Sequence, residues 1–173
     1  MIFETERLIM RPLSESDTDY YFDMMGNPNV MNPVPVKTMN RVESDAHLAD
    51  LLKLDHNGPK KIWAIEIKGG ETFIGLCAIL KNDENDDEIG YRLREGYWGV
   101  GYGSETAKGL IDLAFNSLGF ELITADVNTA NPRSVKILDK FLTPVREFFN
   151  EEGNCTDRRY HLRKEDWLKR PKV

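Results

Sequence analysis

A chain of 173 residues with 40% hydrophobic and 30% charged side chains has the composition of one soluble globular domain, which excludes a disordered acidic chain and a collagen-like repeat. The net charge of -6 disfavours nucleic acid as a partner, because binding phosphates requires a basic face. The longest apolar run, residues 73–80, is far shorter than the ~20 residues that cross a membrane, and the acidic N-terminus does not resemble a targeting peptide. We expect a cytoplasmic protein with no membrane contact.

Cysteine and histidine indicate neither a disulfide framework nor a metal site. Cys77 and Cys155 form no CxxC pair, which fits structural roles in a reducing compartment. The histidines show no HExxH-type spacing and no neighbouring carboxylate cluster that reads as a metal site. The sequence therefore predicts no bound metal.

The N-terminal segment predicts a strand followed by a helix. Residues 6–11 read as a strand, and Pro12 stops it. Ser14 or Ser16 can then cap a helix, because a hydroxyl accepts from the free amides of a first helical turn. The Gly, Asn and Pro of residues 26–28 are expected to end that helix.

A proline-containing segment separates the first helix from a second one. Residues 32–36 contain two prolines and are expected to be loop. Thr38 can cap the second helix, which is expected to end near residues 57–59. The apolar positions assigned to one face of that helix are Val42, Ala46, Ala49 and Leu52.

The remainder of the chain alternates between strand-like and helix-like periods. Strands are expected at residues 62–68, 73–80, 88–93, 122–127, 145–150 and 158–163. Helices are expected from the glycines at 99–103 to about residue 118, and from Asn131 onward. The order predicts a single α+β or mixed α/β domain over residues 1–173, with a largely antiparallel sheet before the glycines.

The stretch that joins strand 88–93 to the following helix has the features of an anion site. Gly99, Gly101 and Gly103 lead into the helix, whose first amides have no intrahelical partner and lie at its positive dipole end. A side chain at Gly101 or Gly103 should therefore block an anion while leaving the fold intact. The spacing is GxGxG, which fits neither GxGxxG nor GxxxxGK[ST]. Taken alone, the glycines could equally shape a tight turn.

Four motifs occur in order along the chain: ETERL-x-x-RPL at residues 4–13, EIGY at 88–91, YWG-x-GY-x-x-E at 97–105 and N-x-x-S at 131–134. A strand and a tryptophan follow at residues 160–167. Together they resemble the GNAT superfamily of N-acetyltransferases. The resemblance is closest to the Rim-type branch, which acetylates the N-termini of ribosomal proteins.

The resemblance implies a sheet of about seven strands flanked by about four helices, splayed between the fourth and fifth strands, 88–93 and 122–127. Acetyl-CoA is the implied co-substrate, with its pantetheine arm paired along the fourth strand. The implied cofactor-binding residues are Tyr91, Arg92 and Leu93 on that strand, Trp98, Gly99, Val100, Gly101, Tyr102, Gly103 and Ser104 around the pyrophosphate, and Asn131 at the pantetheine.

Two residues are candidates for acid and base chemistry. Many GNAT enzymes carry a tyrosine acid where this chain has Leu138, so the resemblance leaves Ser134 to protonate the leaving thiolate. Glu88 is the carboxylate within the motif strand and could draw a proton from the amine through water. Helix capping by Asn131, a surface position for Ser134 and a solvent-facing strand end for Glu88 are the competing interpretations.

The expected reaction is acetyl transfer to a primary amine of a small molecule or a peptide, carried out by a monomer or a homodimer. An α-amine is the easier acceptor, because its reference pKa of about 7.7–8.0 leaves more neutral amine than a lysine near 10.4. Val100 stands where relatives often carry a cation, and residues 140–144 depart from the usual helix ending. The alternative is a degenerate GNAT fold that binds acyl-CoA or a protein without catalysis.

Overall fold

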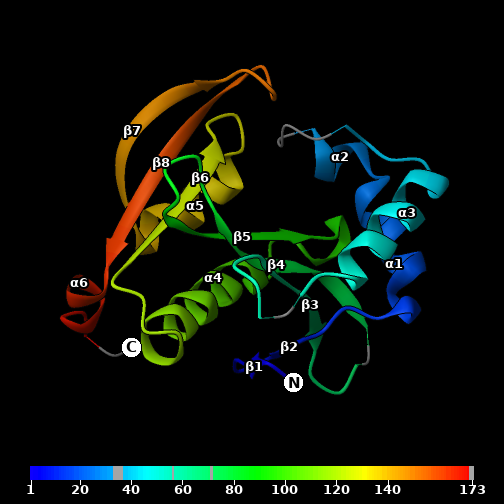
Figure 1. Cartoon of the computed structure of the whole chain (residues 1–173), viewed down its shortest axis with the longest axis horizontal. Helices are drawn as coiled ribbons and strands as arrows, with labels where there is room; N and C mark the ends of the chain where they lie inside the picture. The colour runs from blue at the N-terminus through cyan, green and yellow to red at the C-terminus, as the bar shows by residue number, and fades with distance from the viewer. Residues whose placement is uncertain (33–36, 56, 71, 172–173) are drawn as a thin grey trace.

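The computed structural model describes residues 1–32, 37–55, 57–70 and 72–171. Within these ranges the chain forms an eight-stranded sheet in the order β1-β2-β3-β4-β5-β6-β8-β7 (Figure 1). The strands are β1 (Phe3–Glu4), β2 (Leu8–Arg11), β3 (Lys61–Ile67), β4 (Phe73–Lys81), β5 (Asp87–Leu93), β6 (Leu122–Asn128), β7 (Thr143–Asn150) and β8 (Cys155–Arg163). The predicted mixed α/β class and the antiparallel first half of the sheet are confirmed.

The described residues form six α-helices, three of which begin at a side-chain cap. They are α1 (Thr18–Met25), α2 (Pro28–Met31), α3 (Arg41–Leu52), α4 (Tyr102–Asp112), α5 (Pro132–Phe141) and α6 (Lys164–Leu168). A turn of 3-10 helix, η1 (Glu15–Asp17), precedes α1 and is capped by Ser14, while a π-helical turn, η3 (Leu113–Ser117), extends α4. None of the helices among the described residues is both long and apolar enough to cross a membrane.

Four details of the N-terminal prediction were wrong or incomplete. β1 was not predicted, and Pro28 opens the short helix α2, because the Asn27 side chain caps it by accepting from the Asn29 amide at 2.9 Å. Asn40 caps α3 in place of Thr38. The buried positions of α3 are Ser44, Leu48 and Leu51, whereas Val42 is 78% exposed. The expected loop at residues 32–36 lies outside the described residues except for Asn32, which ends α2.

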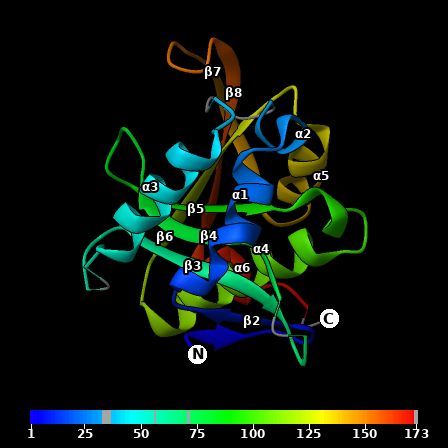
Figure 2. The same ribbon diagram turned by 90° about the vertical axis from the view of Figure 1, so that its right-hand side faces the viewer.

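The sheet is covered on both faces (Figures 1 and 2). Neighbouring strand residues point to opposite faces, so Ile65 packs in the core under α4 while Ala64 packs in the core under α1 and α3. We call the side covered by α4 and α5 the α4 face, and the other side the α1 face. On β5, Ile89 and Leu93 lie in the core of the α4 face, which places Glu88 and Arg92 on the α1 face.

The sheet opens between β5 and β6. These two strands, both fully described, run parallel and pair at Glu88 with Thr124 and at no later residue. β6 then continues alongside β8 over its whole length. Counted without β1, the opening lies between the fourth and fifth strands, as predicted. Beyond this pair, the edge of β5 that is turned toward β6 faces a gap, while the other edge stays paired with β4.

Candidate active site

The glycine loop presents its amides at the start of α4. Gly101 is the N-cap of α4 and has a φ of 91°, and Gly99 has a φ of 78°, a region that disfavours residues with a side chain. The first bond of the helical ladder runs from the Glu105 amide to the Gly101 carbonyl at 3.1 Å. The amides of Tyr102, Gly103 and Ser104 precede it and remain available to an anion.

Trp98 contributes to the loop differently from the expectation. Its amide donates to the Glu95 carbonyl at 3.1 Å, so it is already occupied. Its indole Nε1 donates to the Leu93 carbonyl at 3.0 Å, which ties the loop to the end of β5. Trp98 thus shapes the loop through its ring, and the free amides begin after it.

The backbone of β5 alternates between β4 and the opening. The Arg94 amide donates to the Ile74 carbonyl of β4 at 2.8 Å, so the backbone groups of Arg92 also face β4. Those of Tyr91 and Leu93 face the opening. Of the three residues expected to pair with pantetheine, Tyr91 and Leu93 present backbone groups to the gap, whereas the Arg92 backbone belongs to the ladder with β4.

Asn131 and Ser134 lie together at the start of α5. The Asn131 carboxamide oxygen accepts from the Ser134 amide at 3.3 Å, which confirms helix capping, and its Nδ2 donates to the Ser134 hydroxyl at 3.2 Å. Burial raises the pKa of the Tyr91 hydroxyl, and the neighbouring Ser134 partly offsets that rise. The Tyr91 hydroxyl is buried without a hydrogen-bond partner among the described residues. The sequence pointed to the backbone of Tyr91 but did not reveal the position of its hydroxyl near Ser134, because nothing local links residue 91 to residue 134.

Glu88 lies where the opening begins, on the α1 face. It lines a hollow of about 340 Å³ together with Asp83, Asp126 and Arg159. Burial, and then the charge of Asp126, raises the pKa of Glu88 to about 7. A carboxylate with this pKa exchanges protons near neutral pH, which suits a general base.

Comparison with known proteins identifies the family. The sequence model of a protein family, described as the acetyltransferase (GNAT) domain, matches residues 7–141. An uncharacterized N-acetyltransferase p20 of Bacillus licheniformis is 31% identical over 158 residues, covering 88% of this chain and 84% of the relative. The chain belongs to the GNAT acetyltransferases.

Solved GNAT structures share the fold. The GNAT-family acetyltransferase of Bacillus anthracis superposes with a TM-score of 0.81 at 19% identity, covering 94% of this chain and 98% of that one. RimL, a ribosomal L7/L12 α-N-protein acetyltransferase solved with coenzyme A, superposes with a TM-score of 0.78 at 15% identity, covering 95% and 98%. These likenesses show a shared fold, and the family match shows that the chain is an acetyltransferase.

Cations surround the glycine loop of this GNAT domain although Val100 is neutral. Arg133 of α5 stacks over the Trp98 ring at 4.4 Å, and Lys140 donates to the Ser104 hydroxyl at 3.1 Å. Arg7 donates to the Val100 carbonyl at 3.0 Å, and its charge is partly balanced by Glu105 at 2.7 Å. The sequence could not assign these residues to the loop, because they lie far from it along the chain.

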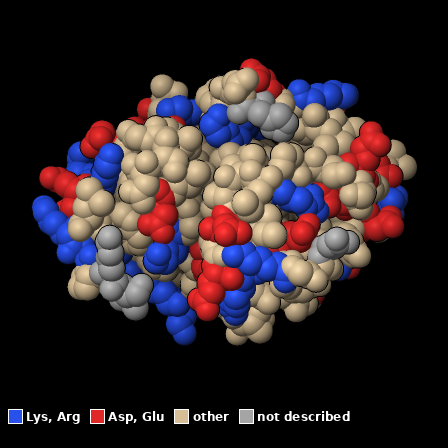
Figure 3. All heavy atoms as spheres, turned by 90° about the horizontal axis from the view of Figure 1, so that it is seen from below, with Lys and Arg blue, Asp and Glu red and all other residues tan. Residues whose placement is uncertain are grey.

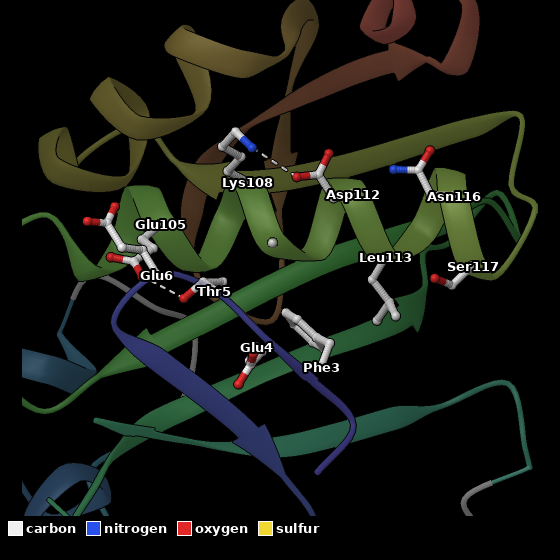
Figure 4. Close-up of a pocket in the computed structure, with 11 residues that line it drawn as sticks. Phe3, Glu4, Thr5, Glu6, Glu105, Lys108, Asp112, Leu113, Asn116 and Ser117 are labelled. Carbon is white, nitrogen blue, oxygen red and sulfur yellow. Dashed lines mark hydrogen bonds and ion pairs between the residues drawn. The ribbon is translucent and has the colours of Figure 1, made fainter. Parts of the chain in front are cut away.

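A larger hollow of about 610 Å³ lies between β1 and α4 (Figure 4). Thr5 donates to Glu105 at 2.6 Å, and Lys108 pairs with Asp112 at 3.0 Å, so these polar side chains already have partners. None of the predicted catalytic or cofactor-binding residues lines this hollow. The opening between β5 and β6 is therefore the candidate site that includes the predicted residues.

Over the face seen in Figure 3, acidic and basic side chains are interspersed.

Gly103 packs closely against α5, so a side chain there is expected to have a structural cost besides its effect on an anion. A Cβ at this position would lie 2.8 Å from Cδ1 of Ile137, so α4 and α5 meet here. Replacing Gly103 by Val should lower the free energy of unfolding by about 1–3 kcal/mol, as overpacking does. Chemical denaturation would measure it, and adding Ile137→Ala should restore part of the loss. An unchanged unfolding midpoint would contradict this contact.

Proposed function

We propose that this GNAT domain transfers the acetyl group of acetyl-CoA to a primary amine by direct attack on the thioester. The observation that carries the proposal is the single β5–β6 pair at Glu88, which puts a carboxylate of raised pKa at the point where the sheet opens. The thioester would lie in that opening, reached by the cofactor from the α4 face and by the amine from the α1 face.

The cofactor would be bound mainly by backbone groups. Its pyrophosphate would accept from the amides of Gly99 to Ser104 at the start of α4, with Arg133 and Lys140 near enough to add positive charge. The pantetheine arm would pair with the outward backbone groups of Tyr91 and Leu93. The Tyr91 amide would also polarise the acetyl carbonyl, and Asn131 would keep its capping role while bordering the arm.

Proton movements follow from the positions of Glu88 and Ser134. The amine nitrogen attacks the carbonyl carbon, the C–N bond forms, and the amine proton passes to Glu88 directly or through water. The C–S bond then breaks, and the thiolate takes a proton through the Ser134 hydroxyl, which regains one from water while Glu88 releases its own to water. That hydroxyl accepts from Asn131, so its own proton is free to be donated. We favour an α-amine as acceptor because more of it is neutral near pH 7.

Replacing Ser134 by Ala should lower kcat by about tenfold to a hundredfold with little change in the KM for acetyl-CoA, because a proton donor to the thiolate acts in the transition state. Steady-state kinetics would show it. Tyr91→Phe should have a smaller effect of the same sign, because the buried Tyr91 hydroxyl lies near Ser134 without a hydrogen bond to it. If both variants match the wild type, water supplies the proton.

The proposed function is tested by incubating the protein with acetyl-CoA and a panel of amines and N-terminal peptides. Release of CoA together with a product 42 Da heavier, the mass of one added acetyl group, is the expected result. CoA binding without turnover on any amine would favour the alternative of a degenerate acyl-CoA-binding module. Acetylation confined to lysine side chains or hydroxyls would contradict the α-amine assignment while preserving the enzyme class.

A further inference from the structure

The Arg92 side chain is an unpaired cation on the α1 face of β5. Its Nη1 lies 3.2 Å from the Met25 sulfur, a weak acceptor, and its Nε is buried without a hydrogen-bond partner. Across residues 1–32, 37–55, 57–70 and 72–171, no carboxylate forms an ion pair with it. A guanidinium in this setting has lost water without gaining an anion, which is unfavourable.

Two other arginines of the same region are paired with carboxylates. Arg94, two residues further along β5, pairs with Asp23 at 2.8 Å and donates to the Phe73 carbonyl at 3.0 Å. Arg159, on the neighbouring part of the sheet, pairs with Asp126 at 2.7 Å. Of these three arginines, only Arg92 lacks a carboxylate partner among the described residues, and an anion from outside the chain would supply one.

Arg92 faces the side from which the amine would approach. It lies four residues from Glu88 on the same face of β5, a separation of about 13 Å between Cα atoms that two long side chains can shorten. The Tyr21 hydroxyl and His47 Nδ1, 2.6 Å apart, lie close enough to Arg92 to feel its charge. The α1 face thus carries a cation near Tyr21 and a carboxylate pair, Glu88 and Asp126, at the opening.

We propose that the acceptor amine also carries a carboxylate, and that Arg92 binds this carboxylate while the amine lies toward Glu88. The proposal rests on the proposed function. A planar guanidinium offers two parallel donors to the two oxygens of a carboxylate, which a thioether cannot match. The acceptor class is therefore an amino acid or a short peptide with a free carboxylate, and not a polyamine. Arg92 is a specificity-determining residue on this assignment.

The test uses matched acceptors that differ only in the anion. CoA release is measured with amino acids as free acids and as carboxamides, and with spermidine as an amine without a carboxylate. The wild type should prefer the acids by about tenfold to a hundredfold in kcat/KM. Arg92→Gln should abolish the preference by raising KM for the acids, with amides changed less than about threefold. Arg92→Lys should keep part of it, and the control Arg94→Gln should keep all of it.

Two results would overturn the proposal: equal use of amides or spermidine by the wild type, or equal losses for acids and amides in Arg92→Gln. Failure of the proposed function is a separate result, with no CoA released by any amine. In that case N-acetylglycine is titrated into the CoA-loaded protein by calorimetry. Binding by the wild type that Arg92→Gln loses would support the carboxylate site, and equal or absent binding in both would overturn it.

Discussion

Replacing Glu88 by Gln is expected to lower kcat/KM by about 10²- to 10⁴-fold, because the amide cannot accept the proton of the attacking amine. In the wild type, kcat/KM should rise with pH through the pKa of Glu88, about 7, and again through that of the acceptor amine. The variant should lose the first of these two rises and keep the second. Steady-state kinetics between pH 5.5 and 9.5, a range chosen to bracket both groups, would separate them.

The same substitution has a stability signature. The folded-state pKa of Glu88 lies above its usual range, so its contribution to stability is present at low pH and is lost as the pH rises through about 7. Relative to the wild type, Glu88→Gln should gain up to about 3 kcal/mol between acidic and alkaline pH. Glu121→Gln, at a carboxylate that is 82% exposed, is the control and should change neither measurement. Wild-type activity in Glu88→Gln would assign proton removal to water.

Replacing Gly101 by Val should weaken acetyl-CoA binding by about a hundredfold. Gly101 caps α4 at a φ of 91°, which a β-branched residue adopts only with strain, and its Cβ would lie 3.2 Å from Nη2 of Arg7. The loop must shift to relieve both, and its amides then no longer converge on one anion. Calorimetric titration with acetyl-CoA would measure the loss.

Gly96→Ala is the matched control for the loop. Gly96 lies in the 3-10 turn η2 (Glu95–Tyr97), has no positive φ, and a Cβ there would meet no atom within 4 Å. It should bind acetyl-CoA as the wild type does. Thermal unfolding of Gly101→Val should show a folded protein, destabilised by about 1–3 kcal/mol through backbone strain. Unchanged affinity in a folded Gly101→Val protein would remove the loop from the cofactor site.

The sequence by itself determined those parts of the protein that depend on local chemistry. Residue alternation identified β5, the strand that carries both Glu88 and Tyr91. The glycines followed by a helical period located the loop at the start of α4. The N-x-x-S pattern located the cap of α5, which Asn131 and Ser134 form within one turn. These features need only neighbours in the chain, so a pattern of residues is sufficient to predict them.

The tertiary structure decided what distant segments do to one another. The pKa of Glu88 depends on Asp126 of another strand, the side-chain environment of Tyr91 depends on Ser134 of α5, and Gly103 is needed because Ile137 packs on it. Whether an arginine is paired is likewise invisible in the sequence. Arg92 lies on β5, and Arg94 directly follows the strand. The packing of α1 places Asp23 beside Arg94, whereas the Arg92 guanidinium contacts the thioether of Met25. Burial and ion pairing depend on contacts between residues that are distant in the sequence, so a local pattern of residues cannot predict them.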